Sequence, residues 1–150
     1  MPTENSFSPD ILLLNGPNLS RLGRSRDPLY GLDTLIDIEG RCLKIANQAG
    51  KKIKMCQSNS EGSLIDIIEQ HFNVKSIVIN PGALMIHGYS LRDALDEFPG
   101  FKVEIHISHI YARENFRRCS ILAPVMDAMI TGLGSRGYDA AVNAVIDHLK

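Results

Sequence analysis

The chain has 150 residues and a mass of 16.6 kDa, which suits one domain with a sizeable core. Its 16 basic and 17 acidic residues give a formal net charge of −1, which argues against nucleic acid or an anionic membrane surface as the main partner. With 44% hydrophobic and 22% charged residues the chain is predicted to be globular, and its apolar runs of about four residues are too short to span a membrane.

The N-terminal segment and the cysteines bear on the cellular compartment. Residues 1–10 are polar, contain two prolines and lack the basic and apolar regions of a secretory signal, so we expect a flexible tail before a single domain at 11–150. The three cysteines are odd in number and widely spaced: Cys42, Cys56 and Cys119. This pattern predicts reduced thiols in a cytoplasmic protein rather than a disulfide framework.

The first predicted strand is followed by a long loop and then by a helix. Residues 11–14 (ILLL) form a continuous apolar run that turn residues end, as in a strand buried on both faces. Residues 15–31 hold three glycines, two prolines and three arginines, and such long loops usually serve as lids or binding elements. Apolar residues then recur every three or four positions, which predicts a helix over 33–49 that ends at Gly50.

The rest of the chain continues this alternation of strands and helices. The remaining elements are predicted, in order, at 53–56, 60–72, 77–79, 90–98, 103–107, 128–131 and 138–149. The order predicts a flavodoxin-like, doubly wound α/β domain, with a five-stranded parallel sheet and helices on both faces.

Polar clusters follow three of these strands, at 15–18, 80–82 and 106–108. In doubly wound sheets, ligands bind outside the carboxyl ends of the strands. The fold therefore predicts that these three clusters, which are distant in sequence, meet in one crevice.

Two short motifs are weak evidence for a cofactor or a metal. The GLGSRG segment at 132–137 matches a dinucleotide fingerprint, but only 13 residues follow it, too few for the strand and acidic residue that this fingerprint requires. We interpret it as a glycine-rich turn. His106 and His109 would point to opposite faces of a strand, so we favour a structural role for one of them over metal ligation.

The long loop carries a candidate general base. Arg21, Arg24, Arg26 and Tyr30 lie within ten residues of one another. Neighbouring cations favour the phenolate form of a tyrosine, which can then accept a proton. A solvated basic loop with one packed tyrosine explains the same pattern, and the loop alone favours that simpler interpretation.

Alternate residues of the fourth strand form a candidate general acid. Glu104, His106 and Ser108 share one face of this strand, and a carboxylate beside an imidazole fixes its tautomer and favours its protonated form. An internally satisfied polar cluster under a loop is an equally good interpretation of this segment alone.

Other polar residues near the crevice suggest the kind of ligand. Asn18, Asn80, Asp93 and Arg117 supply neutral, anionic and cationic groups, which together suggest a small, hydroxylated, anionic substrate. Arg117 can also be explained as half of an ion pair on a helix surface.

Several segments of the chain, taken together in their order and spacing, form a specific signature. They are ILLLNGPNLSRLG, Tyr30-Gly31, QSNSEGSLID, IVINPGAL, SLRDAL, VEIHIS, ARENFRRCS and GLGSRGY. From about residue 11 to 148 the sequence resembles type II 3-dehydroquinate dehydratases. The resemblance implies flavodoxin-like subunits in trimers and commonly dodecamers, and the conversion of 3-dehydroquinate to 3-dehydroshikimate in aromatic biosynthesis or quinate breakdown. It implies anti elimination of water through an enolate, without a metal, a nucleotide or a Schiff base.

The resemblance also implies roles for individual residues. Tyr30 would remove the proton next to the ketone, and His106, oriented by Glu104, would protonate the departing hydroxyl. Asn18 would help to stabilise the enolate through a water. Substrate contacts are expected from Asn80, Gly82, Ala83, His87, Ile107, Ser108, Arg117 and, reaching into a neighbouring subunit's site, Asp93.

Two departures from the family pattern affect these assignments. The resemblance implies an arginine five positions before Tyr30 that would favour its phenolate form and hold the lid loop closed, but Ser25 occupies that position. Arg26 lies one residue later, so we favour Arg26 for that role and keep Arg24 in reserve. Ile86 aligns with the usual substrate-binding histidine, and His87 is one place along. Either the chain bends so that His87 substitutes, or one hydroxyl contact is lost.

Two other functions are considered. A paralogous dehydratase acting on a related cyclic hydroxy acid would explain the departure from the family pattern over residues 85–88. A flavodoxin-like binding module without catalysis is disfavoured, because a base, an acid and carboxylate-binding groups are all present in the sequence.

Overall fold

The apolar segments form a five-stranded parallel sheet in the computed structural model, which describes residues 8–24 and 27–150. Its strands are β1 (Ile11–Asn15), β2 (Ile53–Gln57), β3 (Ser76–Asn80), β4 (Phe101–His106) and β5 (Ala128–Thr131). Their spatial order is β2-β1-β3-β4-β5, and every neighbouring pair is parallel. This is the flavodoxin-like order, so the predicted fold class is confirmed.

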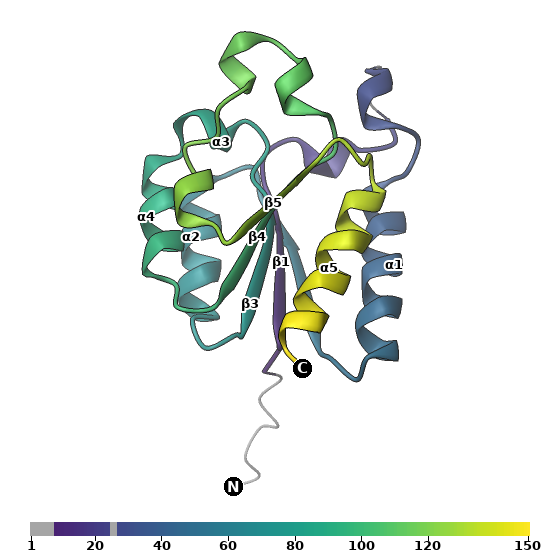
Figure 1. Ribbon diagram of the computed structural model, residues 1–150, viewed down its shortest axis with the longest axis vertical. Helices are drawn as coiled ribbons and strands as arrows, with labels where there is room; N and C mark the ends of the chain where they lie inside the picture. The colour runs from purple at the N-terminus through teal and green to yellow at the C-terminus, as the bar shows by residue number, and fades with distance from the viewer. Residues whose placement is uncertain (1–7, 25–26) are drawn as a thin grey trace, which may run out of the picture.

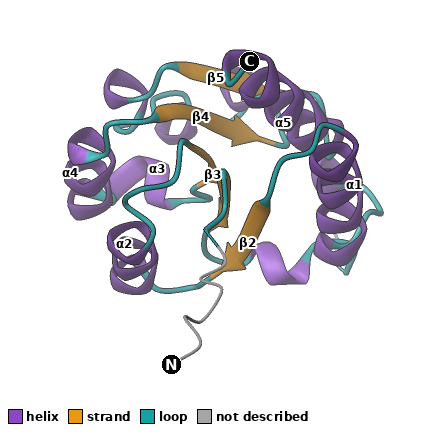
Figure 2. Ribbon diagram, turned by 90° about the horizontal axis from the view of Figure 1, so that it is seen from below, coloured by secondary structure: helices purple, strands orange, loops and turns teal. Residues whose placement is uncertain are grey.

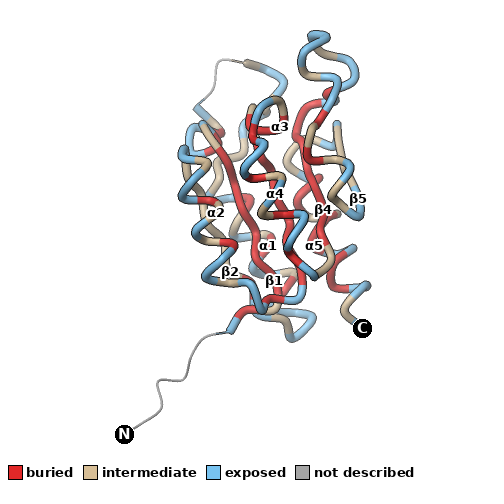
Figure 3. The backbone as a smooth tube through the Cα atoms, turned by 90° about the vertical axis from the view of Figure 1, so that its left-hand side faces the viewer, coloured by how far each residue is buried: buried red, intermediate tan, exposed pale blue. Residues whose placement is uncertain are grey.

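Two pairs of helices cover the two faces of the sheet (Figures 1 and 2). Helices α1 (Leu35–Gln48) and α5 (Arg136–His148) pack on one face, and α2 (Glu61–Gln70) and α4 (Tyr89–Glu97) pack on the other. Successive side chains of β1 alternate between the two cores, with Leu13 in the first and Leu12 in the second. The central strands are therefore buried along their length (Figure 3).

The observed ends of two helices differ from their predicted positions. Helix α1 begins at Leu35 because Thr34 and Asp37 form a reciprocal capping box. Helix α5 begins at Arg136, two residues before the predicted start. The short helix α3 (Leu84–His87) was not predicted, because four residues are too few to show a periodic apolar pattern.

Packed structure extends back before residue 11. Pro9 is buried, and the Asp10 carboxylate accepts a hydrogen bond from the Lys52 backbone N–H at 2.9 Å, which holds the pKa of this carboxyl below its usual value. Residues 1–7 of the predicted tail lie outside the described residues.

The cysteines and helices bear on two further predictions. Cys42, Cys56 and Cys119 are free thiols, and burial raises the pKa of Cys42 to about 12. Within residues 8–24 and 27–150, no helix combines the length and apolar character needed to cross a membrane.

A glycine permits the close approach of β1 and β3 at their carboxyl ends. The Gly16 N–H donates to the Asn80 carbonyl at 2.8 Å, and a Cβ placed on Gly16 would lie 2.5 Å from the Pro81 carbonyl oxygen. The added Cβ would be bonded to the Gly16 backbone, and the oxygen belongs to the Pro81 backbone. Neither atom can therefore move without displacing a strand end.

We expect Gly16→Ala to lower the free energy of unfolding by about 1–3 kcal/mol, as overpacking does in a rigid site. Gly40→Ala is the matched control, because Gly40 is exposed on α1 and a Cβ added there would meet no other residue's atom within 4 Å, apart from the helix's own backbone. It should raise stability by about 0.5–1 kcal/mol. Urea denaturation measures both values, and equal effects of the two substitutions would contradict the prediction.

Candidate active site

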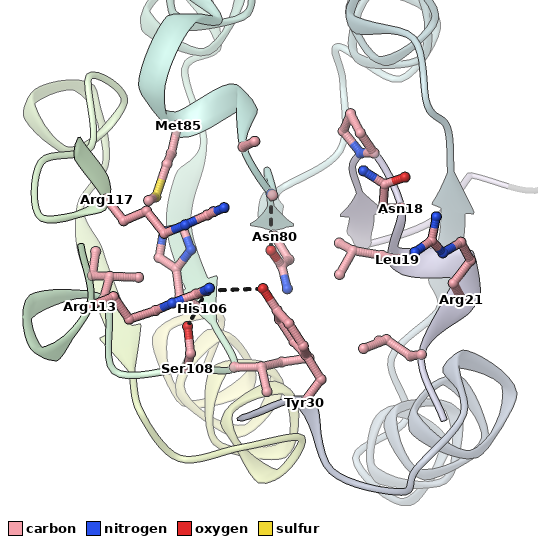
Figure 4. A pocket seen from close by; sticks show the side chains of 16 residues that line it. Asn18, Leu19, Arg21, Tyr30, Asn80, Met85, His106, Ser108, Arg113 and Arg117 are labelled. Atoms are coloured by element: carbon pink, nitrogen blue, oxygen red, sulfur yellow. Dashed lines mark hydrogen bonds between the residues drawn. The ribbon is translucent and has the colours of Figure 1, made fainter. Parts of the chain in front are cut away.

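A cavity of about 110 Å³ opens at the carboxyl ends of β1, β3 and β4 (Figure 4). The residues that line it are Pro17, Asn18, Leu19, Arg21, Leu22, Tyr30, Asn80, Gly82, Ala83, Met85, His106, Ile107, Ser108, Ile110, Arg113 and Arg117. Thus the three predicted polar clusters meet in one crevice.

His106 is held from behind by a buried carboxylate. Glu104 and His106 lie on the same face of β4, and Glu104 Oε1 is 2.6 Å from His106 Nε2. The Ser120 hydroxyl donates to the same oxygen at 2.6 Å. With Nε2–H donating to Glu104, Nδ1 is the ring nitrogen left to exchange a proton in the cavity.

Tyr30 reaches the cavity at the end of a short 3₁₀ turn, Pro28–Tyr30, and its hydroxyl contacts an arginine from another loop. Arg113 Nη1 donates to the Tyr30 hydroxyl at 2.9 Å and to Ser108 Oγ at 3.2 Å (Figure 4). The guanidinium carbon also lies 5.7 Å from the centre of the Tyr30 ring. Arg113 therefore fastens the loop that carries Tyr30 to the loop that follows β4.

Asn80 ends β3 at the floor of the cavity with its side chain fixed. Its Oδ1 accepts from the Gly82 N–H at 3.1 Å, and its Nδ2 donates to the Tyr138 hydroxyl at 2.8 Å. Asn80 is 3% exposed, so this amide has little freedom to take another orientation.

The charges around the cavity favour an anionic ligand. Three guanidinium groups line it, from Arg21, Arg113 and Arg117, and no carboxylate does so among the described residues. Glu114 lies outside the lining and pairs with Arg113 at 3.5 Å and with Arg117 at 3.3 Å. In the described part of the chain, no three His, Cys, Asp or Glu side chains are grouped as a metal site requires.

The comparisons with known proteins agree with one another. Residues 9–146 match the model of the family described as dehydroquinase class II. The chain belongs to the dehydroquinase class II family. It is 45% identical to the 3-dehydroquinate dehydratase of Bacillus licheniformis, with 90% of this chain and 94% of that protein covered. The corresponding values for the Bacillus subtilis 3-dehydroquinate dehydratase are 43%, 92% and 94%.

A solved structure from the same family confirms the fold. The type II dehydroquinase of Propionibacterium acnes superimposes with a TM-score of 0.87 at 36% identity, covering 91% of this chain and 95% of that one.

Most of the residues that the class II resemblance singled out line the cavity or support it. Those that line it are Asn18, Tyr30, Asn80, Gly82, Ala83, His106, Ile107, Ser108 and Arg117, with Glu104 directly behind His106. Asn18 takes a left-handed conformation with φ of 70°, and its N–H donates to Asn59 Oδ1.

Other predicted residues lie elsewhere. His87 and Asp93 are exposed and do not line the cavity, whereas the buried side chain of Met85 does. Arg24 is exposed, donates to the Ser20 carbonyl and is also outside the lining. Arg26 lies outside the described residues.

Sequence reasoning missed Arg113, the arginine that contacts Tyr30. It lies in the ARENFRRCS segment that was singled out for the resemblance, but only Arg117 of that segment received a role. The prediction favoured Arg26, from the cluster of arginines nearest Tyr30 in sequence. The contact itself joins residues 83 positions apart.

The base of the Tyr30 loop is anchored by Arg41 of α1. Its Nη1 contacts Asp33 at 2.8 Å, its Nε contacts Asp139 at 3.1 Å and its Nη2 donates to Ser135 Oγ at 3.1 Å. Hydrogen bonds from Ser135 and Arg41 lower the pKa of Asp33 below its ordinary value of 3.8.

We expect Arg41→Gln to lower the free energy of unfolding by about 1 kcal/mol near pH 7, since the ion pairs are partly exposed. A carboxyl with a lowered folded-state pKa stabilises above its unfolded-state pKa and loses that contribution as the pH falls through the folded-state value. The deficit of Arg41→Gln relative to the parent should therefore shrink below pH 3.8.

Denaturation curves from pH 3 to 7 test this expectation. Lys44→Gln is the control, because Lys44 is an exposed cation on the same helix. A deficit that stays constant across this pH range would show that Asp33 is not the partner that matters.

Proposed function

We propose that this protein dehydrates 3-dehydroquinate to 3-dehydroshikimate. The observation that carries the proposal is that one cavity is lined by a tyrosine, by a histidine that contacts a buried carboxylate, and by three arginines. The names of the curated relatives, which align over more than nine-tenths of their own length, support the same substrate.

Tyr30 is the proposed general base. Its phenolate takes the proton from the carbon next to the ketone, and the electron pair of that C–H bond moves toward the ketone oxygen to give an enolate. The Arg113 guanidinium, 2.9 Å from the hydroxyl oxygen, stabilises the phenolate. Asn18 at the cavity wall is the proposed donor, through a water, to the enolate oxygen.

His106 is the proposed general acid. As the enolate returns to a ketone, its electron pair forms the new carbon–carbon double bond and the C–O bond to the hydroxyl breaks. The proton on His106 Nδ1 joins the departing hydroxyl, which leaves as water. Glu104 and Ser120 keep the ring oriented for this transfer. Proton exchange with solvent then returns Tyr30 and His106 to their starting forms.

The proposed carboxylate site lies at the ends of β3 and β4. Asn80 and the backbone N–H groups of Ile107 and Ser108 bind the substrate carboxylate, beside Gly82 and Ala83, and Arg117 contacts ring hydroxyls. Asn80 ends β3 and the two backbone N–H groups follow directly on β4, so binding requires little reordering.

Assembly into trimers or dodecamers remains part of the proposal. Asp93 is exposed on α4 and away from the cavity of its own chain, so a role in substrate binding requires a second copy.

A related cyclic hydroxy acid is a second candidate substrate. The observation that favours it is Met85, whose thioether side chain lines the cavity, while His87 is exposed outside it. Turnover measured on 3-dehydroquinate and on analogues that lack one ring hydroxyl distinguishes the candidates. A preference for an analogue would favour the second.

The purified protein should convert 3-dehydroquinate into an enone with a rise in ultraviolet absorbance, and Tyr30→Phe should lower kcat by about 10²–10⁴-fold, as loss of a general base does. Circular dichroism should show an unchanged fold. The absence of an absorbance rise with folded parent protein would refute the proposed activity, whereas full activity of Tyr30→Phe would refute the role of Tyr30.

Arg113→Met should lower kcat/KM by about tenfold to a hundredfold, because a charge-assisted hydrogen bond of about 1.5–3 kcal/mol to the proposed base is lost. Lys44→Met removes an equal charge from an exposed position on α1 and should retain parent activity. Comparable losses in the two variants would indicate an effect of net charge alone.

A further inference from the structure

Tyr138 places a hydroxyl group between the ends of β1 and β3, directly behind the cavity floor. The residue lies on α5 with 0% of its surface exposed. Its hydroxyl donates to Asn15 Oδ1 at 2.6 Å and accepts from Asn80 Nδ2 at 2.8 Å. Asn15 and Asn80 are register partners in the sheet, so one phenol joins the polar ends of two strands.

These hydrogen bonds permit only one orientation of the Asn80 amide. Because the Tyr138 proton is given to Asn15, its oxygen faces Asn80 as an acceptor and requires Nδ2 there. The Gly82 N–H requires Oδ1 on the other side. A flipped amide would place Asn80 Oδ1 against the Tyr138 oxygen, so that two acceptors face each other. It would also place Asn80 Nδ2 against the Gly82 N–H, so that two donors face each other. Both arrangements cost free energy in a buried site.

The same orientation determines what Asn80 presents to the cavity. An amide nitrogen carries two protons, and Tyr138 takes only one of them. The second has no acceptor among the described residues, and Asn80 lines the cavity. A donor is thus held ready for an anion.

The phenol remains protonated over the working pH range. Burial raises the pKa of Tyr138 above its usual value, and the hydrogen bond from Asn80 offsets only part of this effect. The proton that it gives to Asn15 is therefore always in place.

We propose that Tyr138 is a positioning residue that fixes the donor face of Asn80 toward the substrate carboxylate. The identity of the ligand in this inference rests on the proposed function, whereas the hydrogen bonds that orient Asn80 do not depend on it. It acts on binding: the Tyr138 hydroxyl hydrogen-bonds to Asn15 and Asn80 and not to the proposed base or acid. Its loss therefore changes KM and leaves the chemical step nearly intact.

Steady-state kinetics on the full-length protein test the proposal. Tyr138→Phe should raise the KM for 3-dehydroquinate about tenfold, the effect of misdirecting one hydrogen bond to a charged group, with kcat within about twofold of the parent. In an Asn80→Ala background the same substitution should have no further effect on KM, because its target is gone. An equal rise in both backgrounds would overturn the proposal.

A core substitution separates positioning from stability. Val142→Ala creates a buried cavity one turn further along α5 without touching Asn80. It should lower Tm but leave KM unchanged. A matching rise in KM for Val142→Ala would show that loss of stability alone explains Tyr138→Phe.

Asn15→Ala is the second variant, for use if Tyr138→Phe does not fold. It retains the packed phenol ring but frees the hydroxyl proton to turn toward Asn80, which permits the flipped amide. KM should again rise, by less than in Tyr138→Phe, and an unchanged KM would count against the proposal.

Nuclear magnetic resonance provides a measurement that does not depend on turnover. The Asn80 side-chain amide signals should shift and broaden in Tyr138→Phe as the amide samples two orientations, whereas in Val142→Ala they should match the parent. Unaltered signals in Tyr138→Phe would overturn the inference. Failure of the parent to convert 3-dehydroquinate would instead refute the proposed function and leave this measurement decisive for Asn80.

Discussion

The register of β1 against β3 is the constraint on which the rest of the site depends. Leu13 pairs with Val78 in the sheet interior, and two residues later Asn15 pairs with Asn80 at its edge. Interior positions are buried on both faces and hold apolar side chains, so polar groups collect where the strands end. A shift of one residue would turn Asn80 away from the cavity and bury its neighbours' side chains on the wrong faces.

Glu104 departs from this segregation, as does the buried Lys102 of the same strand, and Glu104 shows what the site requires of the core. It pairs with Ile79 inside the sheet and is fully buried, where an unpaired charge would be very costly. Two donors, His106 and Ser120, converge on one carboxylate oxygen at 2.6 Å each. The imidazole is thereby fixed from inside the rigid sheet, whereas Tyr30 is held only by loop contacts.

This contrast between sheet and loops also explains how far the sequence could predict the structure. Apolar runs predicted the five strands and periodic apolar residues predicted the longer helices, because strands inside a sheet are buried on both faces and helices on one. Strand-end residues such as Asn80 and His106 were placed correctly for the same reason. The contact of Arg113 with Tyr30 and the exposure of His87 depend on the paths of loops and of the four-residue helix α3, which leave no periodic pattern in the sequence.

The position of Tyr138 in the chain affects how the domain is made. Asn15 and Asn80 leave the ribosome well before residue 138, and until α5 packs against the sheet their amides lack the hydroxyl that joins them. Burying those amides earlier would leave Asn15 Oδ1 and Asn80 Nδ2 without this partner, which favours their hydration on the growing chain. The binding floor is therefore completed only after α5 has been made, so that a nascent chain lacking this helix presents no finished carboxylate site.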